Sequence, residues 1–160
     1  MKLHTILCPT DFSESSHYAF HLAMSLARDH GAQVVVAHVM APPLAYDEVV
    51  ASLPPEFYKE KIWESFRNLE ASDPRVRELR VETKLVEGDP IAEIVGLAEE
   101  TACDLIVMGT HGRSGLRRLL MGSVAENVLR KAPCPVLTVK GPMAALETKE
   151  NGAAAPAAAH

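Results

Sequence analysis

The sequence predicts an α/β domain in which a parallel β-sheet is covered by helices on both faces. Three observations predict this class. Short apolar runs alternate along the chain with segments whose apolar residues recur at the helical spacing of three or four. Most of the short runs are continuously apolar, as expected for strands buried on both faces of a sheet. The length of 160 residues suits a single domain with one sizeable core.

The start of the chain predicts a strand, a helix and a second strand. Residues 3–9 form a short apolar run that ends in proline, which favours a buried strand. In residues 13–30 small and apolar side chains recur at helical spacing, and Gly31 is a typical helix terminator. Residues 33–40 are rich in valine and continuously apolar, which again favours a buried strand.

The middle of the chain predicts a loop, a helix and a strand of a different kind. Residues 41–55 contain several prolines, so we expect mostly loop there. Helical spacing returns over residues 56–71, before Asp73 and Pro74 break it. Residues 79–86 alternate apolar and polar side chains, which is typical of a strand near the edge of a sheet.

The last part of the chain predicts two more helices and two more strands. One helix starts at Asp89 and Pro90, because proline suits the first turn of a helix. Then we expect a strand at 104–108, a glycine-punctuated loop at 109–122, a helix at 123–131 and a strand at 135–140. The final segment, 142–160, is alanine-rich and lacks a periodic core face, so we expect a disordered tail after a domain of residues 1–141.

Composition argues against several classes of partner. The chain has 16 Lys and Arg against 21 Asp and Glu, whereas a general binder of nucleic acids or anionic membranes needs a basic excess. No apolar run approaches the roughly 20 residues of a membrane span, and the amino terminus lacks a signal-peptide pattern. Cys8, Cys103 and Cys134 lie in apolar stretches, which favours reduced core residues over a disulfide framework. We therefore expect a cytoplasmic protein without nucleic-acid or membrane partners.

Two of the predicted strands are followed by residues that can bind a ligand. Parallel sheets bind ligands at the carboxyl ends of their strands. The first strand is followed by Thr10 and Asp11, and the fourth by the loop 109–122. Asp11 is either the cap of the next helix, with Glu14 completing a capping box, or a carboxylate for ribose hydroxyls or Mg²⁺. The residues alone leave both interpretations open.

The loop 109–122 favours a phosphate site. Its glycines let backbone amides approach a polyanion, and the helix that follows offers its positive amino end. Positive charge is concentrated in three arginines, Arg113, Arg117 and Arg118. Ser123 is also expected to cap the next helix, with Glu126 completing a capping box. The alternative to a phosphate site is a flexible connection in which this cap is the only role of Ser123. The loop is not a Walker motif, because no lysine follows its last glycine.

Three segments of the chain, in order, resemble the universal stress protein family. The spacing Gly109-x2-Gly112-x9-Gly122-Ser123 is similar to the G-2x-G-9x-G-(S/T) pattern of the family's ATP-binding branch. Residues 6–13 resemble its first strand and Asp-bearing turn, and residues 132–139 resemble its closing strand. The resemblance covers roughly residues 1–140.

The resemblance implies a single three-layer, Rossmann-like domain of the adenine nucleotide α-hydrolase-like type. Its five-stranded parallel sheet has the order 3-2-1-4-5, with an adenine nucleotide (ATP, ADP or AMP) and Mg²⁺ between strands one and four. Residues on the nucleoside side are implied to be Pro9, Thr10, Asp11, Val39 (through its backbone), Met108 and Gly109. Residues on the phosphate side are implied to be Gly112, Gly122, Ser123 and Val124, with Arg113 carried over at lesser weight.

The implied function is that of a nucleotide-binding regulator in the stress response, with slow or absent hydrolysis. Hydrolysis needs a base and charge stabilisation near the γ-phosphate, and His111 is the only candidate base in the loop. Members of the family commonly form homodimers through the last strand, here residues 136–139. The alternatives are an interaction module that binds no nucleotide, a weak ATPase, or an enzyme of the wider fold with a second pocket in the insertion 41–74.

Two smaller features have structural explanations beside functional ones. His17 and His21 lie one helical turn apart and either pair on a metal or occupy an exposed helix face, and the second interpretation is favoured because no third ligand is nearby. Trp63 and Phe66 are interpreted as core or interface residues rather than as a stacking platform.

Overall fold

The computed structural model describes residues 1–41, 54–110 and 121–141, and a five-stranded sheet forms its centre. All strand pairs are parallel, and the order is β3-β2-β1-β4-β5. The strands are β1 (Thr5–Pro9), β2 (Gln33–Met40), β3 (Val81–Glu87), β4 (Leu105–Gly109) and β5 (Val136–Val139). The fold class and the strand order that the sequence and its resemblance predict are confirmed.

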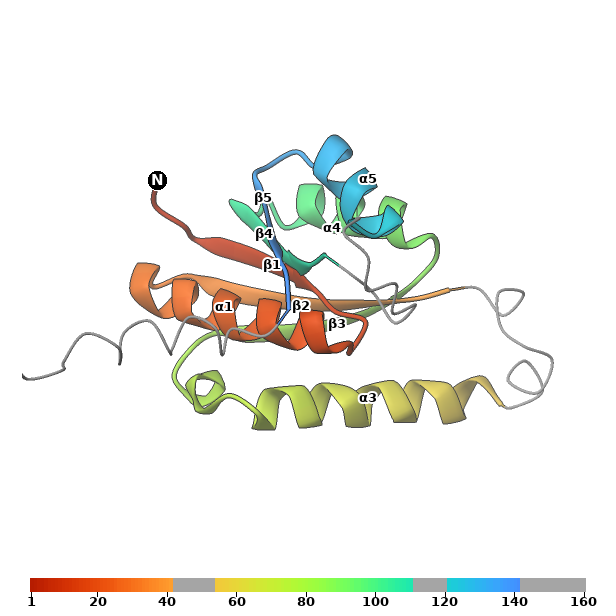
Figure 1. Cartoon of the computed structure of the whole chain (residues 1–160). Helices are drawn as coiled ribbons and strands as arrows, with labels where there is room; N and C mark the ends of the chain where they lie inside the picture. Colours follow the sequence, from red (N-terminus) through yellow and green to blue (C-terminus); the bar gives the residue numbers. More distant parts are fainter. Residues whose placement is uncertain (42–53, 111–120, 142–160) are drawn as a thin grey trace, which may run out of the picture.

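Helices cover the sheet on both faces (Figure 1). On one face lie α1 (Glu14–His30) and α3 (Pro55–Ala71), and on the other lie α4 (Pro90–Glu100) and α5 (Ser123–Lys131). A short 3₁₀ turn, η2 (Pro74–Arg77), connects α3 to β3. None of the helices in the described part of the chain has the length and apolar character needed to cross a membrane.

One hydrophobic core lies on each face of the sheet, because successive side chains of a strand point to opposite faces. In β1, Ile6 and Cys8 face the core beneath α1 and α3, whereas Leu7 faces the core beneath α4 and α5. Phe66 of α3 is 2% exposed in the first core, and Trp63 packs against it with ring centroids 5.3 Å apart. The core interpretation of Phe66 is therefore confirmed, while Trp63 remains 38% exposed.

The boundaries of the elements follow local signals that the sequence carries. Gly31 ends α1 in the left-handed conformation, with φ of 68°. Asp89 caps α4 by accepting a hydrogen bond from the Ala92 amide at 2.9 Å. The edge strand β3 begins two residues later than predicted, because the amide of Leu79 still donates to the carbonyl of Arg75 in the preceding turn. The predicted tail, 142–160, and most of the predicted loop 41–55 lie outside the described residues.

A buried carboxylate fastens the turn η2 to helix α1. Asp73 is 2% exposed and accepts hydrogen bonds from the Arg75 guanidinium at 2.6 and 2.8 Å. His21 of α1 lies 2.8 Å from the same carboxylate through Nδ1. His21 is thus a half-buried partner of Asp73, which corrects the prediction that its helix face is simply exposed.

Candidate functional site

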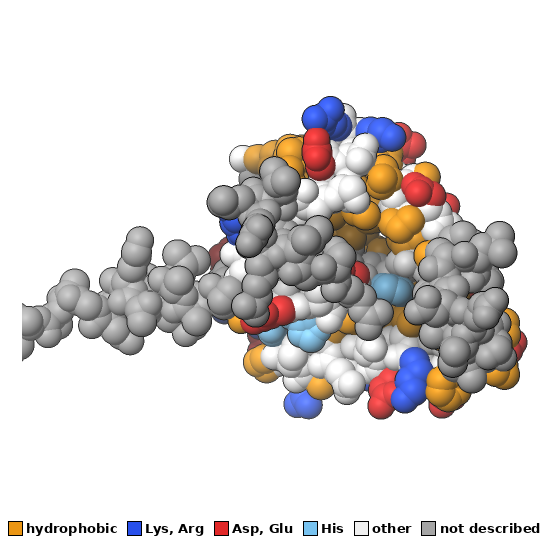
Figure 2. All heavy atoms as spheres, turned by 45° about the vertical axis from the view of Figure 1, so that its right-hand side comes forward, with side chains coloured by type: hydrophobic (Ala, Val, Ile, Leu, Met, Phe, Trp, Pro, Cys, Tyr) orange, Lys and Arg blue, Asp and Glu red, His pale blue; other side chains and the backbone are white. Residues whose placement is uncertain are grey.

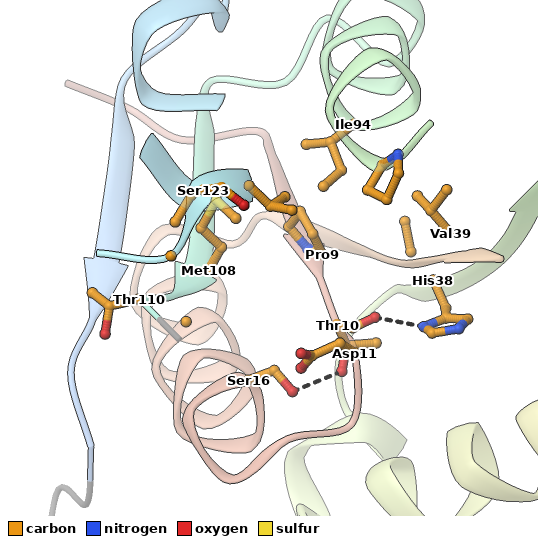
Figure 3. Close-up of a pocket in the computed structure, with 16 residues that line it drawn as sticks. Pro9, Thr10, Asp11, Ser16, His38, Val39, Ile94, Met108, Thr110 and Ser123 are labelled. Atoms are coloured by element: carbon orange, nitrogen blue, oxygen red, sulfur yellow. Dashed lines mark hydrogen bonds between the residues drawn. The ribbon is translucent and has the colours of Figure 1, made fainter. Parts of the chain in front are cut away.

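A cavity of about 230 Å³ lies at the carboxyl ends of β1 and β4 (Figure 3). At this point β1 is flanked by β2 on one side and β4 on the other, so the chain leaves the strands in opposite directions and the edge opens. Apolar side chains gather around a hollow on this face of the molecule in Figure 2. The lining residues include Pro9, Thr10, Asp11, Ser16, His38, Val39, Pro90, Ile94, Met108, Gly109, Thr110, Gly122, Ser123 and Val124.

The turn after β1 is held in a fixed conformation by its own side chains. The Thr10 amide continues the sheet by donating to the carbonyl of Ala37 at 2.8 Å, and its hydroxyl lies 3.1 Å from that of Ser16. Phe12 has a φ of 61°, a conformation that is unfavourable for a bulky residue. Its ring packs at centroid distances of 4.9 Å from His38 and 5.2 Å from Phe66, contacts that stabilise the turn.

Asp11 does not cap helix α1, so that alternative is wrong. The cap is Ser13, whose hydroxyl accepts a hydrogen bond from the Ser16 amide at 3.4 Å. The left-handed Phe12 separates Asp11 from the helix, and the Asp11 carboxylate accepts hydrogen bonds from the amide and hydroxyl of Ser13. This arrangement places the carboxylate at the cavity wall, beside the amino end of α1 (Figure 3).

Ser123 does not cap helix α5 either. The first hydrogen bond of the helix runs from the Glu126 amide to the carbonyl of Gly122 at 3.0 Å, so Gly122 is the cap and Ser123 the first helical residue. Gly122 itself is anchored by the bond from its amide to the Thr110 carbonyl at 2.7 Å. The predicted capping box is therefore wrong, and Ser123 lines the cavity instead.

Gly109 has a structural role that the sequence pattern does not show. A Cβ at this position would lie 2.5 Å from the Ser15 hydroxyl and 2.9 Å from the Ser15 carbonyl carbon. Helix α1 therefore approaches β4 so closely that only glycine fits. The same residue lines the cavity, so its packing role and its place at the site coincide.

His38 and two residues of α4 line the cavity without having been predicted. His38 Nδ1 lies 2.7 Å from the Thr10 carbonyl oxygen, and because a carbonyl only accepts, Nδ1 is the donor. The signal available in the sequence was a single polar residue near the end of an otherwise apolar strand, directly before Val39. Pro90 and Ile94 come from a helix distant in sequence, and no local pattern indicates their place.

Helix ends supply the positive potential of the described part of the site. Ser16 of α1, Pro90 of α4 and Ser123 of α5 all line the cavity, so the first turns of three helices border it. The amino end of a helix carries unpaired amides and about half a positive charge, and attracts anions. The ionisable side chains among the described lining residues are Asp11 and His38.

The predicted site residues fall into two groups. Nine of them line the cavity together: Pro9, Thr10, Asp11, Val39, Met108, Gly109, Gly122, Ser123 and Val124. The other two, Gly112 and Arg113, lie outside the described residues, as do His111, Arg117 and Arg118. Residues that the sequence separates by about a hundred positions are thus neighbours around one cavity.

Comparison with known proteins identifies the family of this chain. The family model described as the universal stress protein family matches residues 2–140. Universal stress protein MJ0531 of Methanocaldococcus jannaschii is 39% identical over 144 residues, covering 86% of this chain and 82% of its own length. The solved structure of MJ0577 from the same organism matches with a TM-score of 0.78 at 31% identity, over 90% of this chain and all of that one.

Two further solved structures contain nucleotides. A universal stress protein in complex with cAMP has a TM-score of 0.67 at 27% identity, over 88% of this chain and 98% of its own. The universal stress protein from Archaeoglobus fulgidus in complex with dAMP has a TM-score of 0.61 at 26% identity, over 88% of this chain and 100% of its own. From the family match and these likenesses, the chain belongs to the universal stress protein family.

Proposed function

We propose that this protein binds an adenine nucleotide (ATP, ADP or AMP) with Mg²⁺ in the β1–β4 cavity and acts as a nucleotide-dependent regulator in the stress response. The observation that carries the proposal is the convergence of three helix amino ends on one cavity at the strand-order switch point. Relatives in complex with cAMP and dAMP support the choice of an adenine nucleotide.

The proposed ligand would use the two ends of the cavity differently. Val39 and Ile94 give one end an apolar wall that suits a purine base, with the Val39 backbone as its polar partner. Asp11, already oriented by Ser13, would accept bonds from ribose hydroxyls or hold Mg²⁺. The amides of Ser123 and Val124 lie in the first turn of α5 and would bind phosphate, together with Gly112 and Arg113 of the glycine pattern.

We further propose that hydrolysis is slow or absent. Phosphoryl transfer to water needs a group that positions the water and one that stabilises the developing charge. In the part of the chain that the structure describes, the cavity is lined by no Lys or Arg, and Asp11 is engaged with Ser13. An ATPase assay of the protein and of His111→Ala tests this point: a turnover that His111→Ala abolishes would make the protein an enzyme.

Direct identification of the ligand tests the proposed function. The protein is purified, denatured and filtered, and the filtrate is analysed by ion-pair chromatography and mass spectrometry. We expect an adenine nucleotide in the filtrate, or, if none survives purification, binding when ATP and MgCl₂ are supplied. An interaction module without a nucleotide site would give an empty filtrate and no binding at millimolar ATP.

We also propose a homodimer that pairs through β5. Among the described strands β5 contacts only β4, so its other edge is open. Leu137 in that strand is 38% exposed, which makes the open edge apolar as well as unpaired. Native proteins rarely leave such an edge uncovered, and pairing with a second copy covers it.

A further inference from the structure

Two cysteines that are far apart in sequence meet at the amino ends of neighbouring strands. Cys103 lies two residues before β4, and Cys134 lies two residues before β5. Since β4 and β5 are parallel, with Ile106 opposite Val136, the segments leading into them are adjacent. Their sulfur atoms are 3.3 Å apart. The two positions are 31 residues apart in the sequence, so no local motif such as Cys-x-x-Cys indicates that they are in contact.

We propose that Cys103 and Cys134 form a redox modification site, at which a hydroperoxide converts the two thiols into an intramolecular disulfide. The sulfurs need to approach by only about 1.3 Å to reach the S–S bond length of about 2.05 Å. Both residues belong to the same packed region beneath α4 and α5, so the approach requires adjustment of side chains and turns rather than of the sheet.

The chemistry balances with a hydroperoxide as the oxidant. The Cys134 sulfur attacks the peroxide oxygen, the O–O bond breaks, and a sulfenic acid and one water (from hydrogen peroxide) form. The Cys103 sulfur then attacks the Cys134 sulfur, the S–O bond breaks, and the departing hydroxide takes the Cys103 proton as a second water. Two thiols lose two electrons together, and hydrogen peroxide is reduced to two waters.

The order of events follows from the different burial of the two thiols. Cys134 is half-buried and can meet an oxidant from solvent, whereas Cys103 is 6% exposed. Burial, and the contact with Cys134, raise the pKa of the Cys103 thiol to about 12, so Cys103 is a poor first nucleophile. Cys103 instead lies in contact with the sulfur that it must attack in the second step.

The third cysteine provides an internal control. Cys8 is fully buried in the core on the opposite face of the sheet, beneath α1 and α3. Its burial raises the pKa of the thiol to about 12, and it belongs to a different core from Cys103 and Cys134. Cys8 should therefore remain reduced while the other two react.

The bond would enclose the β4–α5 part of the molecule in a covalent ring. The ring runs from Cys103 to Cys134 and contains β4 and α5, which carry Met108, Gly109 and Ser123 of the cavity wall. The cysteines themselves lie at the amino ends of the strands, and the cavity lies at the carboxyl ends. The inference goes beyond the proposed function, and its test does not depend on nucleotide binding.

The test is peroxide treatment of the full-length protein, followed by thiol counting and peptide mapping. We expect free thiols to fall from three to one, and the intact mass to fall by two hydrogens. Trypsin should then release residues 85–113 linked to residues 132–140, a link that dithiothreitol cleaves. Peroxide-treated protein that keeps three thiols, or that carries sulfinic or sulfonic acid on Cys134 without the link, would overturn the proposal.

Single substitutions separate the roles of the cysteines. Cys8→Ser, the matched control, should still form the link. Cys134→Ser should form none, whereas Cys103→Ser should leave a sulfenic acid on Cys134 that dimedone traps in peptide 132–140. In the Cys134→Ser variant, dimedone labelling of peptide 85–113 as fast as the labelling of peptide 132–140 in Cys103→Ser would contradict the assignment of Cys134 as the first thiol to react.

Discussion

Asp73 shows how one residue joins two elements that the chain does not connect directly. Its carboxylate accepts hydrogen bonds from the backbone and the guanidinium of Arg75, and His21 brings helix α1 to the same oxygens. These bonds favour the charged form, so the pKa of Asp73 lies far below its ordinary value despite the opposing effect of burial. A charged group in such a position stabilises the fold only while it stays ionised.

Asp73→Asn should therefore destabilise the protein in a pH-dependent manner. At pH 7 we expect the free energy of unfolding to fall by about 2–3 kcal/mol, since a partly exposed Arg75 loses its buried partner. Because the folded-state pKa is depressed, this stabilisation is fully present above the unfolded pKa of about 4 and is lost progressively as the pH falls from there towards the much lower folded-state pKa. The difference between wild type and variant in urea unfolding should shrink from pH 7 to pH 3, and a constant difference would contradict the assignment.

At the scale of elements, the close packing of α1 on β4 depends on Gly109. Gly109→Ala should lower the free energy of unfolding by about 1–3 kcal/mol, because the new Cβ meets Ser15 backbone at 2.9 Å and the helix must shift. The matched control is Gly96→Ala in α4, where a Cβ meets nothing within 4 Å. There the same change should raise stability by about 0.5–1 kcal/mol. Thermal or urea unfolding of the two variants measures the contrast, and equal effects would show that Gly109 is not constrained by packing.

The elements were predictable from sequence to the extent that local signals define them. The valine-rich β2 and the Gly31 terminator are local, and their predicted bounds agree with the structure. The helix caps were not predictable in the same way. The helix begins at Ser123 as predicted, yet its cap is not Ser123 of the capping-box pattern but the preceding Gly122, whose amide is fixed by Thr110. Such a bond depends on tertiary contacts that a local pattern does not contain.

The site was predictable where a motif marks it and not elsewhere. The glycine pattern and the turn after β1 indicated Asp11, Gly109 and Gly122 before the structure brought them to one cavity. Ile94 and the Cys103–Cys134 contact arise only from the pairing of strands and helices distant in sequence. The pairing of β4 with β5 decides the cysteine contact, and the packing of α4 on the sheet decides the position of Ile94.

At the scale of the whole molecule, the open edge of β5 predicts assembly. Leu137→Asp should convert the proposed dimer to a monomer, because a carboxylate directly at a paired edge would be buried without a partner. Phe57→Asp is the control, since Phe57 is 46% exposed and belongs to α3, a helix that lies away from β5 in Figure 1. Sedimentation equilibrium of the three proteins decides the matter: a monomeric wild type, or a Leu137→Asp dimer of unchanged affinity, would contradict the proposed interface.

The central claim is that the cavity between β1 and β4 binds an adenine nucleotide with its phosphates at the amino end of α5. Gly122 tests it selectively, because its φ of −60° and ψ of 151° are open to any residue, so a side chain there needs no change of backbone conformation. The most direct measurement is calorimetric titration of ATP with MgCl₂ into nucleotide-free wild type, Gly122→Val and the control Gly96→Val. We predict saturable binding by wild type and the control, and at least a hundredfold loss of affinity in Gly122→Val with an unchanged circular dichroism spectrum. No heat from wild type at millimolar ATP, or wild-type affinity in Gly122→Val, would contradict the claim.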